Sequence, residues 1–220
     1  MKNIDFHAHI LPLADHGSDS IETSLNQIEL SKAAFIDAIV ATPHFYPHRH
    51  KLSDFIKRRD SSYQILNEKT DAEVILGAEV LICDNLDKLD GLSKLCIGQT
   101  SCILVELPFS DFRHEYIECV ENMIIAGYTV IIAHADRYKK ENINALISLG
   151  AKIQLNASSL SSVFVKKHLL KWIELGYVVA LGSDIHRNDK TAYKKFNKAK
   201  KRLKNNYTEI MHKTQMILNI

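Results

Sequence analysis

The chain lacks the segments that would place it in a membrane or outside the cell. None of the apolar runs among its 220 residues is long enough to span a bilayer. Its first ten residues, MKNIDFHAHI, include Asp5 and two histidines where a signal peptide needs an apolar stretch. The net charge of +2 gives no reason to expect a nucleic-acid partner. These absences predict a cytoplasmic protein that does not bind nucleic acid.

Several catalytic signatures are missing as well. The four cysteines (Cys83, Cys96, Cys102 and Cys119) form no C-x-x-C pair, and in a reducing compartment we expect them to be small buried hydrophobic residues. None of them is followed by arginine six positions later, which excludes the C-x5-R motif of cysteine-based phosphatases. The sequence also has no G-x-S-x-G elbow, no Walker A loop and no G-x-G-x-x-G. These absences favour metal-activated hydroxide over a protein nucleophile.

Apolar segments of strand length alternate along the chain with helix-like segments. Most are continuously apolar, which is typical of parallel strands buried on both faces. Seven strands with helical crossovers predict an α/β fold, either a doubly wound sheet or a closed barrel. Because no linker or internal repeat is visible, we expect one domain over residues 1–220. The predicted strands are Lys2–Ile10, Ala38–Thr42, Glu73–Val80, Cys102–Leu107, Thr129–Ala133, Lys152–Asn156 and Val178–Gly182.

The segments between these strands carry helix signals. Ser20 is a candidate N-cap for a helix over Ile21–Ala34, and a second helix over Ser53–Asn67 opens with a capping-type serine. Three later helices are expected to end near Gly127, Gly150 and Gly176, because glycine readily adopts the left-handed conformation that follows many helix ends. Two further helices are predicted after Lys190. The three later helices are Glu115–Ala126, Glu141–Leu149 and Lys166–Leu175.

Polar side chains collect at the ends of the predicted strands. Histidine, the commonest metal ligand in proteins, occurs 11 times. His7 and His9 lie two residues apart in the first strand, so both side chains project to the same side. In β/α folds the active site forms where the C-terminal ends of the strands converge. We therefore expect the following side chains to meet: His7, His9, Asp15, His44, Glu79, Glu106, His134, Asn156, Asp184 and His186.

This set of side chains predicts a metal site. Imidazole and carboxylate without thiolate suit zinc, manganese or iron. The set exceeds the need of one ion, so we expect two or three, which would also offset the repulsion between carboxylates. Arg137 follows His134 by three residues and is expected to bind an anion in the same cavity. Metal-activated water beside an arginine points to hydrolysis of an anionic ester, most commonly a phosphate ester.

Six short motifs follow one another between Lys2 and His186. They are DFHAHILP with Asp15 and Gly17 after it, ATPH at Ala41–His44, GAEV at Gly77–Val80, VELPF at Val105–Phe109, IIAHADRY at Ile131–Tyr138 and LGSDIH at Leu181–His186. In order and spacing they resemble the polymerase and histidinol phosphatase (PHP) superfamily. More closely, they resemble its bacterial branch of manganese-dependent protein tyrosine phosphatases from capsular and exopolysaccharide clusters.

This resemblance implies a distorted seven-stranded (β/α) barrel of PHP type with extra C-terminal helices and up to three metal ions. Manganese is the ion that it implies first, with zinc or iron as alternatives. It also implies cytoplasmic action on phosphotyrosines in the C-terminal tail of a membrane-bound tyrosine autokinase that regulates capsule or exopolysaccharide synthesis. Arg137 would bind the phosphate, and Glu79 would bridge metal ions. The implied ligands are His7, His9, Asp15, His44, Glu79, Glu106, His134, Asp184 and His186.

The chain departs from the family pattern at three places. The family has two aspartates before the glycine, and the second of these is His16 here, so the ligand is either Asp15 or His16. The family motif H-P-E-R reads H-A-D-R over residues 134–137, and Phe45 stands where a polar residue usually follows the second-motif histidine. These departures affect the expected substrate preference more than the expected metal binding.

Several functional questions stay open from the sequence. His44 and His48 are both candidates for the general acid. The alternatives to a protein tyrosine phosphatase are a small-molecule phosphatase, such as one for histidinol phosphate, and a non-catalytic metal-dependent binding module. The basic stretch Lys190–Lys204 is either a solvated helix face or a surface steered to an acidic partner or the inner membrane. Apolar residues of the last helix, such as Met211 and Met216, predict either packing on the barrel or an oligomer contact.

Overall fold

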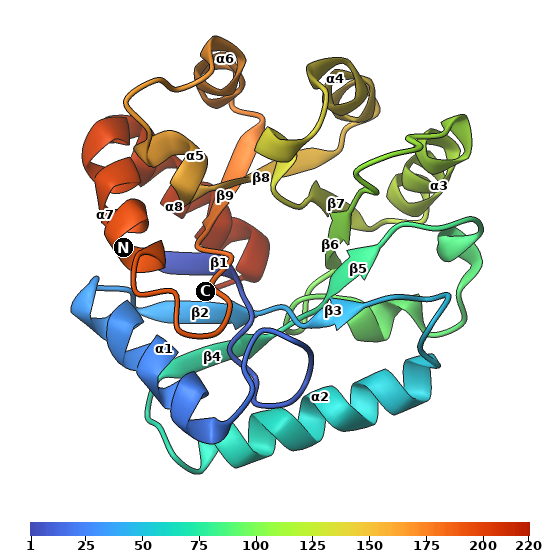
Figure 1. The fold of residues 1–220 in the computed structure, drawn as a ribbon. Helices are drawn as coiled ribbons and strands as arrows, with labels where there is room; N and C mark the ends of the chain where they lie inside the picture. Colours follow the sequence, from blue (N-terminus) through green and yellow to red (C-terminus); the bar gives the residue numbers. More distant parts are fainter.

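The structure, a computed structural model, describes all 220 residues. Strands and helices alternate along the chain as predicted, and every strand pairing is parallel. The strands surround the centre of the molecule and the helices lie outside them (Figure 1). The strands are β1 (Ile4–Ala8), β2 (Ala38–Ala41), β3 (His44–Phe45), β4 (Glu73–Leu76), β5 (Glu79–Leu81), β6 (Cys102–Glu106), β7 (Thr129–Ile132), β8 (Lys152–Asn156) and β9 (Val178–Gly182).

The strands form two sheets rather than one closed barrel. One sheet has the order β1-β2-β4 and the other β3-β5-β6-β7-β8-β9. The α/β class with parallel strands is therefore confirmed, whereas the predicted seven-stranded barrel is not, because nine strands lie in two separate ladders. Between β1 and β9 there is only an isolated bridge, Ala8 to Ile185, flanked by the hydrogen bond from Asp184 N to His7 O at 2.8 Å.

One predicted strand is interrupted, and one short strand was not predicted. The predicted strand Ala38–Thr42 corresponds to β2, and β3 lies beyond its end. Pro43 separates β2 from β3, and since proline has no N–H it cannot donate to a ladder. The predicted strand Glu73–Val80 is divided into β4 and β5 at Gly77. Hydrogen bonds still cross this break, from Gly77 N to Ala41 O at 2.9 Å and from Glu79 N to Pro43 O at 3.1 Å. The interruption moves Glu79 from the end of a strand to the start of β5, where it pairs in register with His44.

The predicted helices are found within about two residues of their expected ends, an ordinary uncertainty for helix boundaries. Ser20 caps α1 as predicted, with its side chain accepting from Thr23 N. Ser53 does not cap α2, which starts one residue earlier after Lys51 without a side-chain cap. The short α5 was not predicted. The helices are α1 (Ile21–Ala33), α2 (Leu52–Asn67), α3 (His114–Ile125), α4 (Lys140–Ser148), α5 (Ala157–Ser161), α6 (Lys167–Glu174), α7 (Ala192–Leu203) and α8 (Asn205–Leu218).

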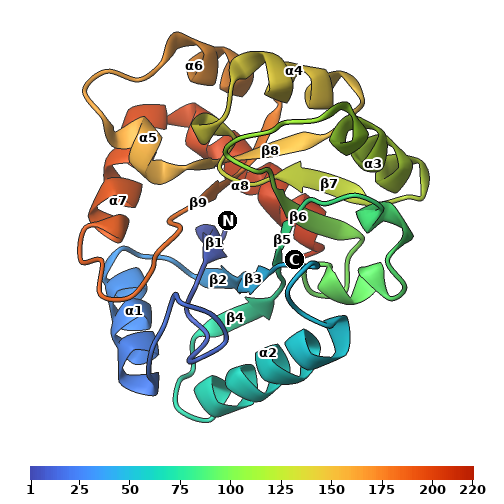
Figure 2. The ribbon, with the colours of Figure 1, turned by 45° about the vertical axis from the view of Figure 1, so that its right-hand side comes forward.

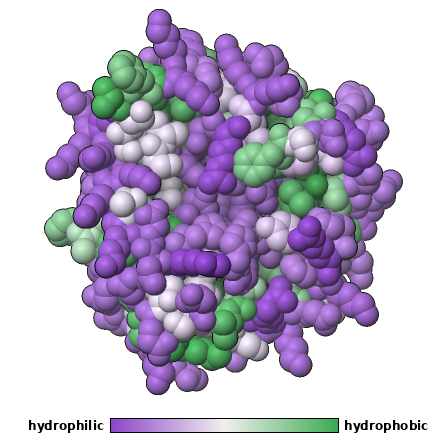
Figure 3. All heavy atoms as spheres, viewed as in Figure 1, coloured by the Kyte–Doolittle hydropathy of each residue, from purple (hydrophilic) through white to green (hydrophobic).

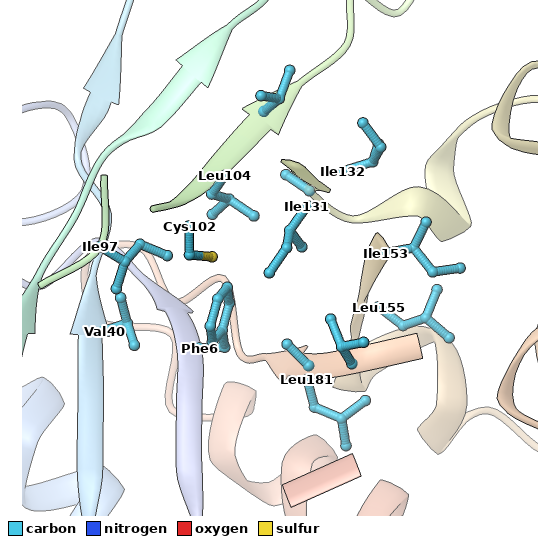
Figure 4. Close-up of a cluster of buried hydrophobic side chains, with 14 of the residues drawn as sticks. Phe6, Val40, Ile97, Cys102, Leu104, Ile131, Ile132, Ile153, Leu155 and Leu181 are labelled. Atoms are coloured by element: carbon cyan, nitrogen blue, oxygen red, sulfur yellow. The ribbon is translucent and has the colours of Figure 1, made fainter. Parts of the chain in front are cut away.

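One contiguous core fills the space between strands and helices. Its 62 buried apolar residues come from nearly every element, so no second core is present. Side chains from β1, β2, β6, β7, β8 and β9 meet in it, including Phe6, Leu104 and Leu181 (Figure 4). Cys96, Cys102 and Cys119 are buried as predicted, while Cys83 is half-buried, and all four are free thiols.

The last two helices complete the fold on the side where β1 and β9 begin. Helix α8 lies behind the strands and packs against β9 and β1 (Figure 2). Met211 is buried there, whereas Met216 is 66% exposed. Helix α7 buries Tyr193 and Phe196, whereas Lys194, Lys198 and Lys201 are exposed to solvent. None of the helices is both long and apolar enough to cross a bilayer.

Candidate metal centre

The predicted strand-end side chains converge in the middle of one face of the molecule. Hydrophilic residues gather at the centre of this face, and green hydrophobic patches lie mainly toward its periphery (Figure 3). His7 comes from β1 and His9 from the residues just after it, whereas Glu106 closes β6. His134 follows β7, and Asp184 follows β9. Parallel strands thus bring residues from distant parts of the chain to one point, as expected for the C-terminal ends of β/α units.

Glu79 lies at the centre of this cluster and is fully buried. Its Oε2 atom lies 3.2 Å from His7 Nε2, 3.3 Å from His9 Nε2 and 3.0 Å from His44 Nδ1. Its Oε1 atom lies 2.7 Å from His134 Nε2. One carboxylate therefore faces four imidazoles and separates two groups of donors, an arrangement suited to a carboxylate shared by two cations.

Three overlapping groups have donor atoms close enough to hold an ion. They are His7–His9–Glu79, His44–Glu79–Glu106 and His9–His44–His186, each with all its donor atoms within 4.8 Å of one another. Two groups share Glu79. The third contains imidazole alone, a donor set that suits zinc, copper, iron or nickel. His16 adds a further imidazole beside it, with its ring centroid 4.8 Å from that of His44 and 4.9 Å from that of His186.

Two buried atoms in the cluster have no hydrogen-bond partner. His44 Nδ1 and Glu79 Oε2 are both buried and unsatisfied, although they lie only 3.0 Å apart. A buried polar group without a partner costs about 1–3 kcal/mol, so such atoms are rare in folded proteins. A divalent cation between them would satisfy both, and the residues present therefore fit bound metal.

The donor histidines are held through their second ring nitrogens. His9 Nδ1 lies 2.7 Å from Asp15 Oδ2, His7 Nδ1 lies 3.2 Å from Gln154 Oε1, and His134 Nδ1 lies 3.1 Å from the hydroxyl of Tyr138. Each bond turns the opposite nitrogen, Nε2, toward Glu79. Partners of this kind fix the tautomer and orientation of metal-binding histidines.

Gln154 connects several of these groups from inside the fold. Its Oε1 atom also accepts from His134 N at 2.6 Å, and its Nε2 donates to Asn156 Oδ1 at 3.0 Å. Asn156 Nδ2 in turn donates to Asp184 Oδ2 at 3.0 Å. A buried chain of amides therefore fixes His7, His134 and Asp184 relative to one another.

The backbone is strained where two of the predicted ligands lie. His134 has φ of 29° and Asp184 has φ of 54°, a region that residues with a Cβ seldom occupy. Close packing also fixes His7, because a Cβ on Gly182 would lie 2.5 Å from His7 Cβ. Unfavourable backbone angles and tight packing of this kind are typical of functional sites, where a fixed geometry is kept at the expense of stability.

The charges in this cluster shift one another's pKa. Burial lowers the pKa of His9, but the neighbouring carboxylates, Asp15 first, outweigh burial and raise it well above its usual value. Burial and the adjacent Glu79 carboxylate raise the pKa of Glu106 to about 8. Burial and His9 lower the pKa of His186 to about 4. Protons therefore compete with cations for this site, as at other clustered ligands.

Arg137 reaches the cluster through Asp184. Its guanidinium Nη2 donates to Asp184 Oδ2, and the side chain is 36% exposed. Burial raises the pKa of Asp184, but His7, His9 and Arg137 outweigh burial and hold it well below its usual value. An arginine that is partly exposed beside a buried cluster can turn to meet an anionic ligand.

The structure thus brings together nearly all the predicted site residues. His7, His9, His44, Glu79, Glu106, His134, Asp184 and His186 surround one volume, with Arg137 at its edge. Asp15 lies behind His9, and both of its oxygens accept hydrogen bonds, from His9 Nδ1, Gly17 N and His44 N. His48 lies on the exposed loop, with its ring 6.2 Å from that of Tyr46.

Two residues of the site were not predicted. Gln154 is a polar residue between the apolar Ile153 and Leu155 of β8, and that break in the pattern was the available signal. Tyr138 follows His134 by four residues, and its hydroxyl also donates to Leu107 O at 2.9 Å. Its role follows from a loop conformation that no local pattern reveals.

Comparisons with known proteins give one consistent result. A family described as "Capsular polysaccharide synthesis, CpsB/CapC" matches residues 3–219. The chain is 30% identical over 198 residues to the tyrosine-protein phosphatase YwqE of Bacillus subtilis, covering 83% of this chain and 77% of that protein. It is 27% identical over 203 residues to the tyrosine-protein phosphatase CpsB of Streptococcus agalactiae, covering 84% of each.

A solved structure has the same fold. It comes from work on YwqE of Bacillus subtilis and CpsB of Streptococcus pneumoniae, described as unique metal-dependent tyrosine phosphatases. It superposes with a TM-score of 0.82 at 22% identity, covering 98% of this chain and 94% of that one. At this identity the match supports the fold.

Proposed function

The chain belongs to the CpsB/CapC family of capsular polysaccharide synthesis proteins, and on this premise we propose that it is a metal-dependent protein tyrosine phosphatase. The single observation that carries the proposal is the position of Glu79. Its two oxygens face four imidazoles from three parts of the chain, at 2.7 to 3.3 Å. Such a carboxylate has little structural value without cations, since burying an uncompensated cluster of charges is costly.

The ligands that we assign are Glu79 and seven residues around it. His7, His9 and Asp184 would serve one ion, and Glu106 with His134 a second, with Glu79 shared. His44 would join Glu79 and Glu106 through Nδ1, and His186 would mark a third position beside His9, whose own Nε2 serves the first ion. We infer two or three ions, with manganese suited to the carboxylate-bearing positions, and zinc or iron as alternatives. Asp15 we assign to positioning His9 rather than to binding metal, because both its oxygens are already used.

Divalent ions held there would lower the pKa of bound water toward neutrality and stabilise charge on phosphoryl oxygens. The chain's own residues would bind the phosphate and hold the ligands in position. Arg137 would leave Asp184 and bind two phosphoryl oxygens, which orients the phosphorus for in-line attack. Asp15, Gln154 and Tyr138 would keep the imidazoles fixed while charge develops.

The leaving group of phosphotyrosine is a phenolate whose conjugate acid has a pKa of about 10. A donor of a proton assists its departure. His44 turns Nδ1 to Glu79, which leaves its Nε2 to hold a proton for the leaving oxygen. His48 lies beyond Tyr46 on the exposed loop. We therefore favour His44 over His48 as the general acid.

The biological role that we propose follows the family. The substrate would be the phosphotyrosine-bearing C-terminal tail of a bacterial tyrosine autokinase that controls capsule or exopolysaccharide synthesis. The chain would act as one domain in the cytoplasm. The exposed lysines of α7, including Lys194, Lys198 and Lys201, would favour a position near the anionic inner membrane surface.

The test is phosphate release by protein stripped of metal with a chelator and then supplied with manganese, zinc or iron. A tyrosine-phosphorylated peptide and histidinol phosphate are compared as substrates. The proposal predicts metal-restored release from the peptide, and loss of it in Glu79→Gln but not in Glu209→Gln, which removes an exposed carboxylate of α8. Preference for histidinol phosphate would change the substrate class. Metal binding without release from either substrate would support a binding module.

A further inference from the structure

A second cavity opens beside the cluster on the side of His44. It has a volume of about 300 Å³ and is lined by Ala14, Asp15, His16, His44, Tyr46, Arg49, His50 and Arg58. Asp15 is its one acidic residue, and that carboxylate is already committed to His9, Gly17 and the backbone of His44. The cavity is therefore positively charged overall and continuous with the proposed metal ligands.

Both arginines in this cavity lack an anionic partner. The polar contact of the Arg58 side chain is a hydrogen bond from Nε to Ala14 O at 2.8 Å, which leaves its two terminal nitrogens free. Arg49 is exposed, and its Cζ lies 5.7 Å from the centroid of the Tyr46 ring, with no carboxylate in reach. By contrast, Arg59 and Arg113 each pair with an aspartate. Two free guanidinium groups around one cavity form a receptor for an anion.

We propose that this cavity binds a second anionic side chain of the same substrate chain, either a carboxylate or another phosphate. The inference rests on the proposed phosphatase function and adds a specificity subsite to it. Arg137 meets the cluster through Asp184, whereas Arg49 and Arg58 line a cavity on the side of His44 and Tyr46. The reacting phosphate and the second anion would therefore occupy different positions.

The distance between the two positions fits neighbouring residues of one peptide. The ring of Tyr46 is near both His44 and Arg49, with its centroid 5.2 Å from that of His44 and 5.7 Å from Arg49 Cζ. Arg49 Cζ therefore lies no more than roughly 11 Å from the centre of the His44 ring, and an extended chain advances roughly 3.3 Å per residue. The second anion is expected two or three residues from the phosphotyrosine.

The experiment compares phosphotyrosine peptides that differ at one position. One peptide has neutral flanks, and others carry glutamate, a second phosphotyrosine or lysine two or three residues before or after the reacting residue. The kcat/KM ratio of each charged peptide to the neutral one is measured for wild type, Arg49→Gln, Arg49→Glu and the control Arg202→Gln. Arg202 is exposed on α7, so its substitution changes net charge equally without touching the cavity.

Wild type is expected to favour an anionic peptide about five- to tenfold, with the gain shrinking as salt is raised. Arg49→Gln should remove most of this preference, Arg49→Glu should shift it toward lysine, and Arg202→Gln should leave the ratio unchanged. The glutamate and phosphotyrosine arms tell which anion is preferred. An equal loss for neutral and anionic peptides would place Arg49 at the reacting phosphate and overturn the subsite.

Failure of the subsite and failure of the phosphatase function remain distinguishable. If neutral peptides are hydrolysed but no anionic peptide is preferred, the function holds and the subsite is wrong. If nothing is hydrolysed, the affinity of metal-loaded protein for the same peptides, carrying a non-hydrolysable phosphonate in place of the phosphate, tests the subsite directly. Equal affinity for the neutral and anionic versions would then refute it.

Discussion

Replacing Gln154 by leucine is expected to remove the hydrogen bonds that hold the proposed metal ligands in place. The substitution removes the acceptor for His7 Nδ1 and for the backbone N–H of His134, together with the donor to Asn156. The His134 N–H would be left buried and unpaired in a strained conformation, with φ of 29°. One such group costs about 1–3 kcal/mol.

Two effects of this change can be separated. The metal-free protein should lose about 1–3 kcal/mol, which for a chain of this size lowers Tm by about 2–4 °C per kcal/mol. Metal affinity should fall about 10- to 100-fold in addition, because His7 loses the partner that fixes its ring. The assay is thermal unfolding with and without manganese, combined with calorimetric titration of the metal.

Thr214→Val is the matched control. Thr214 is equally buried and bonds to Val179 O at 2.7 Å, but it lies in α8 at the opposite end of β9 from the cluster. This variant should lose stability without losing metal affinity. If Gln154→Leu binds manganese as tightly as wild type while it loses stability, the positioning role of Gln154 is refuted.

Three further predictions follow from the same geometry. Asp15→Asn should weaken metal binding about 10- to 100-fold, because Asp15 orients the His9 ring. It should also lower the pKa of His9, because the Asp15 carboxylate stabilises the protonated ring. Titration of the His9 ring by NMR measures this pKa, and an unchanged value would contradict the positioning role of Asp15. Burial lowers the pKa of His7, but nearby carboxylates outweigh burial and raise it, as they do for His9. Protonated His7 and His9 therefore stabilise the metal-free protein fully below about pH 6.5, and this stabilisation is lost as the pH rises through their folded pKa values. Bound metal needs both rings unprotonated, so the rise in Tm on adding manganese should grow between about pH 6 and about pH 8, and a rise that shrinks over this range would contradict the ligand assignment. Gly182→Ala should displace His7 and Gln154, because the new methyl group would lie 2.5 Å from His7 Cβ and 2.7 Å from Gln154 Nε2. We expect weaker metal binding in calorimetric titration. Unchanged binding would show that the strand can move aside.

The convergence of the candidate ligands could be predicted because it follows from simple periodicity. Buried parallel strands end at one edge, and residues two apart in a strand share a side, so His7, His9, Glu106 and Asp184 were placed together from sequence alone. The helix ends at Gly127, Gly150 and Gly176 were predictable for a similar reason, and these glycines have φ of 93°, 106° and 78°.

Other features depend on contacts between distant segments and were out of reach. The short β3 follows Pro43 and was not predicted, and Gly77 divides one predicted strand, yet a proline or glycine in a sequence does not reveal whether the ladder continues past it. The choice between Asp15 and His16 depended on where the loop after β1 turns, and the structure directs Asp15 to His9 and stacks His16 on His44. Gln154 is 20 residues from His134 and 147 residues from His7 along the chain, and Tyr138 meets the His134 ring through the turn between them, so both sets of contacts exist only after folding.

The measurement that tests the central claim most directly is the rate of phosphate release from a tyrosine-phosphorylated peptide as manganese is added stepwise to metal-free protein. Our account predicts a negligible rate without metal and a rise that levels off after two or three equivalents. Glu79→Gln should show no such rise at any amount of manganese. Release by the metal-free protein at the same rate, or full activity in Glu79→Gln, would contradict the account.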